Sequence, residues 1–366
     1  MESTTSELRQ SRGVIEAYRE FLPVSPSTPI VSLAEGNTPL VYCPQLSDRV
    51  GRGCQVFVKN EGVNPTGSFK DRGMTVAVSK AMERGAKALI CASTGNTSAS
   101  AAAYAARAGI PCIVVLPAGK IATGKLVQAF AYGARIVAID GSFDDALRIV
   151  RELGDGHRFV VVNSINPDRI AGQKTAAFEI VDVLEDAPDF HLLPVGNAGN
   201  ITAYWAGYRD YRSHQISTTL PTMIGFQAAA AAPIFYNRIV EKPETIASAI
   251  RIGNPAGWKQ ACAAIAESHG AIDIVSDEEI LAAQSWLAKR EGIFVEPASA
   301  AAIAGLFKCC QSHQEACSFQ NIPEASRVVC TVTGHGLKDP DPIIRQIGEL
   351  KPVAPTVEDV RRVIGL

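Results

Sequence analysis

The chain alternates short apolar runs with longer helix-like stretches, and this alternation constrains the fold more than any other feature. The apolar runs in its first half predict strands at residues 88–92, 112–116, 135–139 and 159–163. The stretches between and before them predict helices at 68–84, 98–108, 124–132 and 143–153. Because these strands are apolar throughout, we expect a parallel sheet that helices cover on both faces.

A second series of the same kind follows. It predicts strands at 192–195, 222–226, 272–275 and 328–332, and helices near 200–212, 258–268, 277–290 and 299–309. The 366 residues are enough for two lobes. We therefore expect a two-lobed α/β protein with its active site in the cleft between the lobes. The small, mobile domain would span residues 60–163, and the large, discontinuous domain 1–59 and 164–366.

Composition excludes several classes of function. The formal net charge is −2 and no long basic run occurs, so we expect no nucleic-acid partner. The most apolar stretch, residues 99–118, contains Arg107 and Pro111 and predicts no membrane span. The nine cysteines include no Cys-x-x-Cys and no Cys/His cluster of zinc spacing. We expect reduced thiols, a cytoplasmic location and no metal site.

The segment Asn64-Pro-Thr-Gly-Ser-Phe-Lys-Asp-Arg-Gly73 is the first candidate for chemistry. A turn leads directly into a helix, with Ser68 as its expected cap and Asp71 three residues on. Lys70 would then lie in the first turn, where the positive end of the helix dipole lowers the pKa of an amine. A lysine that attacks a carbonyl must be neutral. A solvated helix lysine is the alternative for Lys70 taken alone.

Three further segments lie at predicted strand ends or helix starts. Residues 93–98 (Ser-Thr-Gly-Asn-Thr-Ser) carry small polar groups that suit a carboxylate or phenolate, or an ordinary cap. Residues 196–200 (Gly-Asn-Ala-Gly-Asn) form a loop suited to phosphate, with neither a Walker A nor a dinucleotide pattern. Residues 331–340 (Thr-Val-Thr-Gly-His-Gly-Leu-Lys-Asp-Pro) end a strand in a hydroxyl, and His335 alone would be structural.

Together these four segments resemble the threonine synthase branch of the fold-type II pyridoxal-phosphate (PLP) enzymes. NPTGSFKDR and TGHGLKDP are strong signals of that branch, and EPASAA at 296–301 also resembles it. STGNTS and GNAGN occur in looser form in serine and threonine dehydratases and in cysteine synthases. The resemblance runs from about Leu33 to Pro340.

The resemblance implies a PLP cofactor and a role for each matching residue. Lys70 would form the covalent link to the cofactor and later move protons at the substrate. Asn96 would bind the ring hydroxyl, and Thr333 would meet the ring nitrogen, which a hydroxyl cannot keep protonated. The cofactor phosphate would be held by Gly196, Asn197, Ala198, Gly199 and Asn200.

The resemblance also implies a lyase that converts O-phospho-L-homoserine and water to L-threonine and phosphate, in a homodimer. The candidate contacts for the substrate carboxylate or phosphate are Ser93, Thr94 and Thr97. Those for the substrate phosphate are Asn163, Ser164 and Arg169. The guanidinium of Arg169 could offer two parallel donors, or could form a surface ion pair. Lys59, expected at a strand end, could add charge, although a solvated lysine is more usual there.

Other functions stay open at this point. A threonine or serine dehydratase would need no second anion site, and TGHGLKDP favours the synthase. A cysteate-synthase-like lyase shares much of the pattern. A non-catalytic PLP-binding protein would have no need of the reactive amine of Lys70. A nucleotide-dependent oxidoreductase is disfavoured because the dinucleotide fingerprint is missing.

Overall fold

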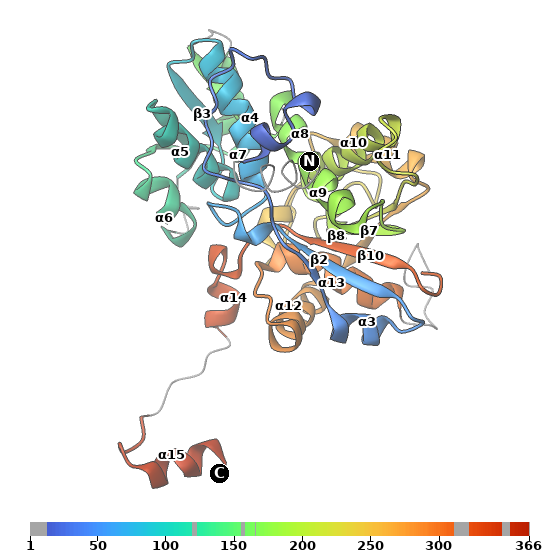
Figure 1. The fold of residues 1–366 in the computed structure, drawn as a ribbon. Coiled ribbons are helices and arrows are strands. Elements are labelled where there is room, and N and C mark those ends of the chain that lie inside the picture. The colour runs from blue at the N-terminus through green and yellow to red at the C-terminus, as the bar shows by residue number, and fades with distance from the viewer. Residues whose placement is uncertain are drawn as a thin grey trace.

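The computed structural model describes residues 13–118, 123–154, 158–164, 166–310, 322–345 and 352–365. Their strands form two separate sheets (Figure 1). The strands are β1 (Leu40–Tyr42), β2 (Gln55–Asn60), β3 (Ala88–Ala92), β4 (Cys112–Pro117), β5 (Arg135–Ile139), β6 (Phe159–Val161), β7 (Phe190–Pro194), β8 (Thr222–Ala228), β9 (Ala271–Val275) and β10 (Arg327–Val332).

The helices match the predicted alternation and add several short elements. They are α2 (Val14–Ala17), α3 (Pro44–Val50), α4 (Lys70–Glu83), α5 (Asn96–Ala108), α6 (Thr123–Ala131), α7 (Phe143–Gly154), α8 (Pro167–Gln173), α9 (Thr175–Leu184), α10 (Gly199–Ser213), α11 (Trp258–Glu267), α12 (Asp277–Glu291), α13 (Pro297–Cys309), α14 (Asp341–Ile344) and α15 (Val357–Ile364). The 3₁₀ turns are η1 (Arg19–Phe21), η2 (Glu61–Val63), η3 (Ser248–Ile250) and η4 (Gly336–Lys338).

The smaller sheet has the strand order β5-β4-β3-β6, and all its pairs are parallel. Alternate residues of β3 enter two different cores. Leu89 and Cys91 pack with α4 and α5, whereas Ile90 and Ala92 pack with Ala146 of α7. Both faces of this sheet are therefore covered, which explains why its central strands are apolar throughout and confirms the expected parallel arrangement.

The larger sheet has the order β1-β2-β10-β7-β8-β9. From β2 to β9 it is parallel, and α13 covers one face while α9, α10 and α11 cover the other. Its edge strand β1 pairs antiparallel with β2. The sequence patterns bounded neither β1 nor β2, although they placed Lys59 at a strand end. Strand β1 has only three residues, and β2 finds its parallel partner β10 some 270 residues further along the chain.

One detail of the lysine segment is wrong in the sequence-based prediction. Helix α4 begins at Lys70 with Phe69 at its N-cap, and the side chain of Phe69 makes no capping bond. The hydroxyl of Ser68 makes only a long contact with the amide of Lys70, at 3.4 Å. Asp71 instead accepts hydrogen bonds from the backbone and hydroxyl of Thr66, both at 2.7 Å. The reason is tertiary: Ser68 forms a bridge with Gly334 and the amide of Phe69 donates to the carbonyl of Thr333, so the turn before the helix is held by the segment after β10.

Helices α4 and α8 cross in close backbone contact at two glycines, Gly73 and Gly172. A Cβ at Gly172 would lie 2.0 Å from the carbonyl oxygen of Arg72, and a Cβ at Gly73 would lie 2.6 Å from that of Arg169. Only glycine permits this approach of the two backbones. Since Lys70 is on α4 and Arg169 is on α8, the crossing determines how closely these two side chains meet. Figure 1 shows α4 and α8 side by side in the middle of the molecule.

We expect Gly172→Ala to lower the free energy of unfolding by about 1–3 kcal/mol, because the added methyl group overpacks a backbone contact. Urea unfolding followed by circular dichroism measures this. Gly141→Ala is the control, since its Cβ would meet only the flexible side chain of Asp145, at 3.1 Å. That variant should stay within about 0.5 kcal/mol of the parent. Equal midpoints for the two variants would contradict the assigned crossing.

Candidate active site

The lysine segment and the segment after β10 are joined by backbone hydrogen bonds. The amide of Phe69 donates to the carbonyl of Thr333 at 3.0 Å, and the amide of His335 donates to the carbonyl of Gly67 at 2.9 Å. Lys338 Nζ adds a bond to the carbonyl of Thr66 at 2.8 Å. These contacts bring the two most specific sequence motifs together and place the start of α4 beside the end of β10.

Lys70 lies at the first position of α4, as the sequence indicated. Burial of the ammonium, and then the nearby cation Arg169, lower the pKa of Lys70 to about 7, while Glu296 partly opposes the shift. The expected direction of the shift is confirmed, but its main cause is desolvation rather than the helix dipole. At pH 7 about half of the amines are then neutral. Lys70 remains partly exposed, as a group open to a ligand must be.

Asn96 begins α5 and is buried. Its Nδ2 donates to both carboxylate oxygens of Glu296, at 3.0 and 3.1 Å. Glu296 is buried as well, and burial raises its pKa while Asn96 opposes the shift. Glu296 sits against Gly334, where a Cβ would be 2.5 Å from Oε1. The carboxylate therefore holds the amide of Asn96 next to the motif that carries Thr333.

Thr333 follows β10 and is buried against Ser299 of α13. The two hydroxyl oxygens are 2.8 Å apart. Ser299 also accepts the backbone amides of Thr333 at 2.9 Å and of Gly334 at 2.8 Å. Two residues of the same helix start, Glu296 and Ser299, thus contact the two predicted ring partners, Asn96 and Thr333.

The loop that precedes α10 supplies backbone and amide donors. Ala198, at its N-cap, has a left-handed φ of 64°, and Gly199 opens the helix. The side chain of Asn200 is buried, and neither of its amide atoms has a hydrogen-bond partner. An unpartnered buried amide is costly unless a ligand satisfies it. Together with the 15-residue helix that starts there, it fits a cofactor phosphate.

Arg169 of α8 is completely buried. Its Nη1 donates to the carbonyl of Val162 at 3.0 Å, while Nε and Nη2 have no partner. Burial lowers its pKa to about 10, which still leaves a cation at neutral pH. The surface ion pair considered from the sequence is therefore excluded. Two adjacent, unused N–H groups on a buried guanidinium form the geometry of a bidentate anion contact.

The other candidate substrate residues fall into two groups: Asn163 and Ser164 hydrogen-bond other parts of the protein, and the remaining three are partly exposed. Asn163 makes two bonds to the backbone of Ala92, at 2.9 and 3.1 Å, and so extends the β3–β6 pairing. The hydroxyl of Ser164 accepts a bond from Asn197 Nδ2 at 2.9 Å. That bond joins the predicted phosphate loop to the segment that leads into α8. Ser93, Thr94 and Thr97 are partly exposed at the start of α5.

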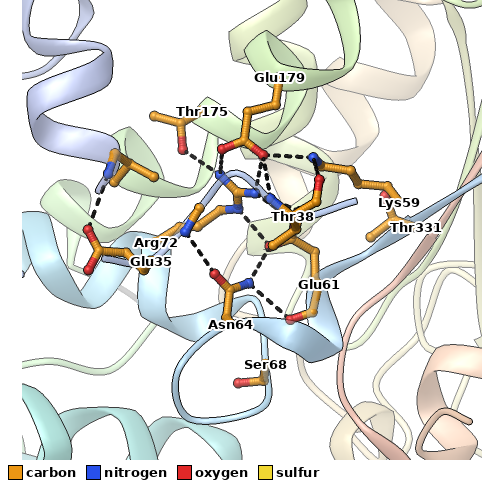
Figure 2. Close-up of polar contacts among 12 residues, drawn as sticks. Glu35, Thr38, Lys59, Glu61, Asn64, Ser68, Arg72, Thr175, Glu179 and Thr331 are labelled. Atoms are coloured by element: carbon orange, nitrogen blue, oxygen red, sulfur yellow. Dashed lines mark hydrogen bonds and ion pairs between the residues drawn. The ribbon is translucent and has the colours of Figure 1, made fainter. Parts of the chain in front are cut away.

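A buried charge cluster, shown in Figure 2, consists of Arg72, Glu61, Glu179 and Lys59. Arg72 bonds Glu61 through Nε at 2.6 Å and Glu179 through Nη1 at 2.7 Å and Nη2 at 2.6 Å. Lys59 Nζ donates to Glu179 at 2.7 Å. Burial by itself would raise the pKa of Glu179, but the two cations outweigh it and hold the pKa at about 2. Two cations and two carboxylates leave this buried charge cluster neutral.

This cluster corrects the interpretation of Lys59. The residue lies at the carboxyl end of β2, as expected, but it is almost wholly buried rather than solvated. Sequence reasoning also missed Glu296 and Ser299 as site residues. The available signals were their place in the EPASAA segment and, for the cluster, the position of Arg72 directly after the Lys70-Asp71 pair.

Known proteins resemble this chain over most of its length. A family model described as pyridoxal-phosphate dependent enzyme matches residues 31–334. A threonine synthase of Synechocystis sp. is 55% identical over 356 residues, which cover 97% of this chain and 91% of that protein. A threonine synthase of Methanocaldococcus jannaschii is 51% identical over 348 residues, which cover 93% of this chain and 84% of that protein. The structure of maize serine racemase has a TM-score of 0.71 at 21% identity, covering 85% of this chain and 91% of that one.

The chain therefore belongs to the pyridoxal-phosphate-dependent enzymes. Its full-length similarity to curated threonine synthases confirms the expected branch of that family, the lyase activity that goes with it and the dependence on PLP. The likeness to serine racemase shows the shared fold alone. The unpartnered amide of Asn200, the neutral-leaning amine of Lys70 and the paired hydroxyl of Thr333 all fit the cofactor.

In the part of the chain that the structure describes, no helix has the length and apolarity to span a membrane. No group of three or more His, Cys, Asp or Glu side chains in the same ranges is arranged to hold a metal ion.

We expect Arg72→Met to lower the free energy of unfolding by about 3–5 kcal/mol, because it leaves two buried carboxylates with only Lys59 to balance them. Urea unfolding measures this change. Arg148→Met is the matched control, since its partners Asp145 and Glu152 are exposed and that pairing should contribute at most about 1 kcal/mol. A loss below about 1 kcal/mol for Arg72→Met would contradict the role given to the cluster.

Proposed function

We propose that the chain carries out the threonine synthase reaction with O-phospho-L-homoserine and water as substrates, releasing L-threonine and phosphate. This proposal rests on one observation: Arg169 is a buried cation with two unused N–H donors, and it lies near the amine of Lys70, whose pKa is about 7. A dehydratase would have no use for a second anion site. A desolvated guanidinium is costly, and a phosphate ester offsets that cost when it binds.

The bound cofactor supplies an electron sink conjugated to the substrate Cα. Lys70, in its neutral form, would remove the proton from the substrate Cα and return it later. Asn96 and Thr333 would hold the ring, and the loop of Gly196, Asn197, Ala198, Gly199 and Asn200 would hold the cofactor phosphate. The unpartnered amide of Asn200 supports this assignment.

Arg169 would bind the substrate phosphate and keep the departing phosphate in place after the Cγ–O bond breaks. Asn163 and Ser164 precede it in the chain and would add polar contacts. The bond between Ser164 and Asn197 would hold the two anion-binding segments at a set separation. Ser93, Thr94 and Thr97 would receive the substrate carboxylate, since they are partly exposed at the start of α5.

We also propose the two-domain division, with residues 60–163 as the small domain and 1–59 with 164–366 as the large one. The existence of two separate sheets supports it, since β3 to β6 fall in the first range and the other six strands in or at the edge of the second. The remaining proposals are a cytoplasmic location, consistent with the cysteine spacing, and a homodimer by analogy with the family.

The neutral amine of Lys70 makes cofactor capture depend on pH. Desolvation lowers the pKa to about 7, so the reactive fraction grows as pH rises through that value. Apoenzyme mixed with PLP should develop the visible absorbance of lysine-linked PLP, which differs from that of free PLP, several-fold faster at pH 8 than at pH 6. The Lys70→Ala variant should keep the absorbance of free PLP at every pH. A pH-independent rate, or a variant with the parent's absorbance, would contradict the assignment.

Phosphate release and threonine formation from O-phospho-L-homoserine test the function directly, with O-phosphoserine as the competing substrate. Arg169→Ala should raise the KM for phosphohomoserine by about 100-fold or more, because a charge-assisted bidentate contact is lost, and the variant should still bind PLP. Arg169→Lys keeps the charge but not the two parallel donors, and should recover only part of the loss. Absence of threonine, or an unchanged KM, would argue against the proposal.

A further inference from the structure

We infer that Ser299 is a positioning residue that sets the direction of the hydroxyl of Thr333, so that this hydroxyl donates its proton to the unprotonated ring nitrogen of the cofactor. The inference deepens the proposed function and rests on Thr333 as the contact of that nitrogen. Neither the sequence patterns nor the family resemblance assigned a role to Ser299.

The hydrogen bonds of Ser299 determine the direction of its contact with Thr333. A serine hydroxyl has one proton to donate and two lone pairs to accept. Both lone pairs of Ser299 are in use, since its Oγ accepts the backbone N–H of Thr333 at 2.9 Å and that of Gly334 at 2.8 Å. Because backbone amides can only donate, these two bonds have a known direction. Ser299 can therefore take part in any further bond only as the donor.

The further bond is the contact between the two hydroxyls, whose oxygens are 2.8 Å apart. The alternative acceptor for the Ser299 proton, the carbonyl of Gly334, is more distant at 3.3 Å. Ser299 is thus the donor to Thr333, and Thr333 Oγ1 accepts. The proton of Thr333 is then left free to point elsewhere.

The direction matters because both a hydroxyl and a pyridine nitrogen carry lone pairs. A threonine whose proton was already committed to Ser299 would present a lone pair to the ring, and would favour a protonated nitrogen. A threonine that accepts from Ser299 presents its proton, and favours the unprotonated nitrogen. Both oxygens are buried, so water does not compete for these positions.

The rigid setting of Ser299 supports a positioning role. It is the third residue of α13, whose first residue is Pro297, and its own amide donates to the carbonyl of Glu296 at 3.0 Å. Glu296 in turn holds the amide of Asn96. One helix start therefore orients the groups proposed for both the ring hydroxyl and the ring nitrogen.

The test is the ¹⁵N chemical shift of the ring nitrogen in holoenzyme loaded with ¹⁵N-labelled PLP, together with the dissociation constant of PLP. The parent and Ser299→Thr, which keeps the hydroxyl, should show an unprotonated nitrogen that accepts a hydrogen bond. Ser299→Ala should move the signal in the direction seen for Thr333→Val and weaken PLP binding by about 3- to 10-fold, the loss of about one hydrogen bond. If Ser299→Ala does not fold, Ser299→Cys, a weaker donor of similar size, takes its place.

The double variant distinguishes an effect of Ser299 that acts through Thr333 from an independent effect of Ser299. If Ser299 acts through Thr333, Ser299→Ala made in the Thr333→Val background should change PLP affinity by less than about twofold. Multiplying effects, or an unmoved nitrogen signal in Ser299→Ala when Thr333→Val moves it, would overturn this inference and leave the proposed site intact. A signal that Thr333→Val itself leaves unchanged would remove Thr333 from the ring, and so would overturn the site assignment as well.

Discussion

The structure around the reactive amine depends on a buried ion cluster centred on Arg72. Its guanidinium bonds Glu61, which follows β2, and Glu179 of α9, and Lys59 of β2 completes the charge balance. Arg72 is two residues after Lys70 on α4, so the same contacts that neutralise the arginine also hold the start of that helix (Figure 2). Such a cluster adds little net stability over an apolar core, but losing one member is costly. It therefore defines one position for Lys70.

Arg72 and Arg169 are both fully buried, but they differ in their partners, which supports a structural role for Arg72 and the proposed binding role for Arg169. Arg72 meets carboxylates that neutralise it, whereas two N–H groups of Arg169 have no partner. A chain with a net charge of −2 offers no general attraction for an anionic substrate. One desolvated cation can provide that attraction locally. Its repulsion also helps to lower the pKa of Lys70, so the proposed substrate contact would be linked to the reactivity of the amine.

The start of α13 holds the two residues proposed to contact the cofactor ring, Asn96 and Thr333. Glu296 holds Asn96, and Ser299 holds Thr333 together with the amide of Gly334. Neither residue needs to touch the reacting atoms to matter. Hydrogen bonds among buried groups have few alternatives, so the direction of each bond is determined by its neighbours. If Thr333 contacts the ring nitrogen as proposed, the electronic state of the cofactor ring would be controlled by a serine that makes no contact with it.

The sequence by itself determined the α/β class, since buried parallel strands are apolar at every position and that pattern is local. It also identified the segments around Lys70, Asn96, Asn200 and Thr333, because glycine and small polar residues at strand ends are readable without a fold. Only the tertiary structure decided that Lys59 is buried rather than solvated, that Ser68 bridges Gly334 instead of capping α4, and that Ser299 meets Thr333. Each of these depends on partners more than 30 residues away along the chain, and local patterns carry no information about which distant residue a side chain will face.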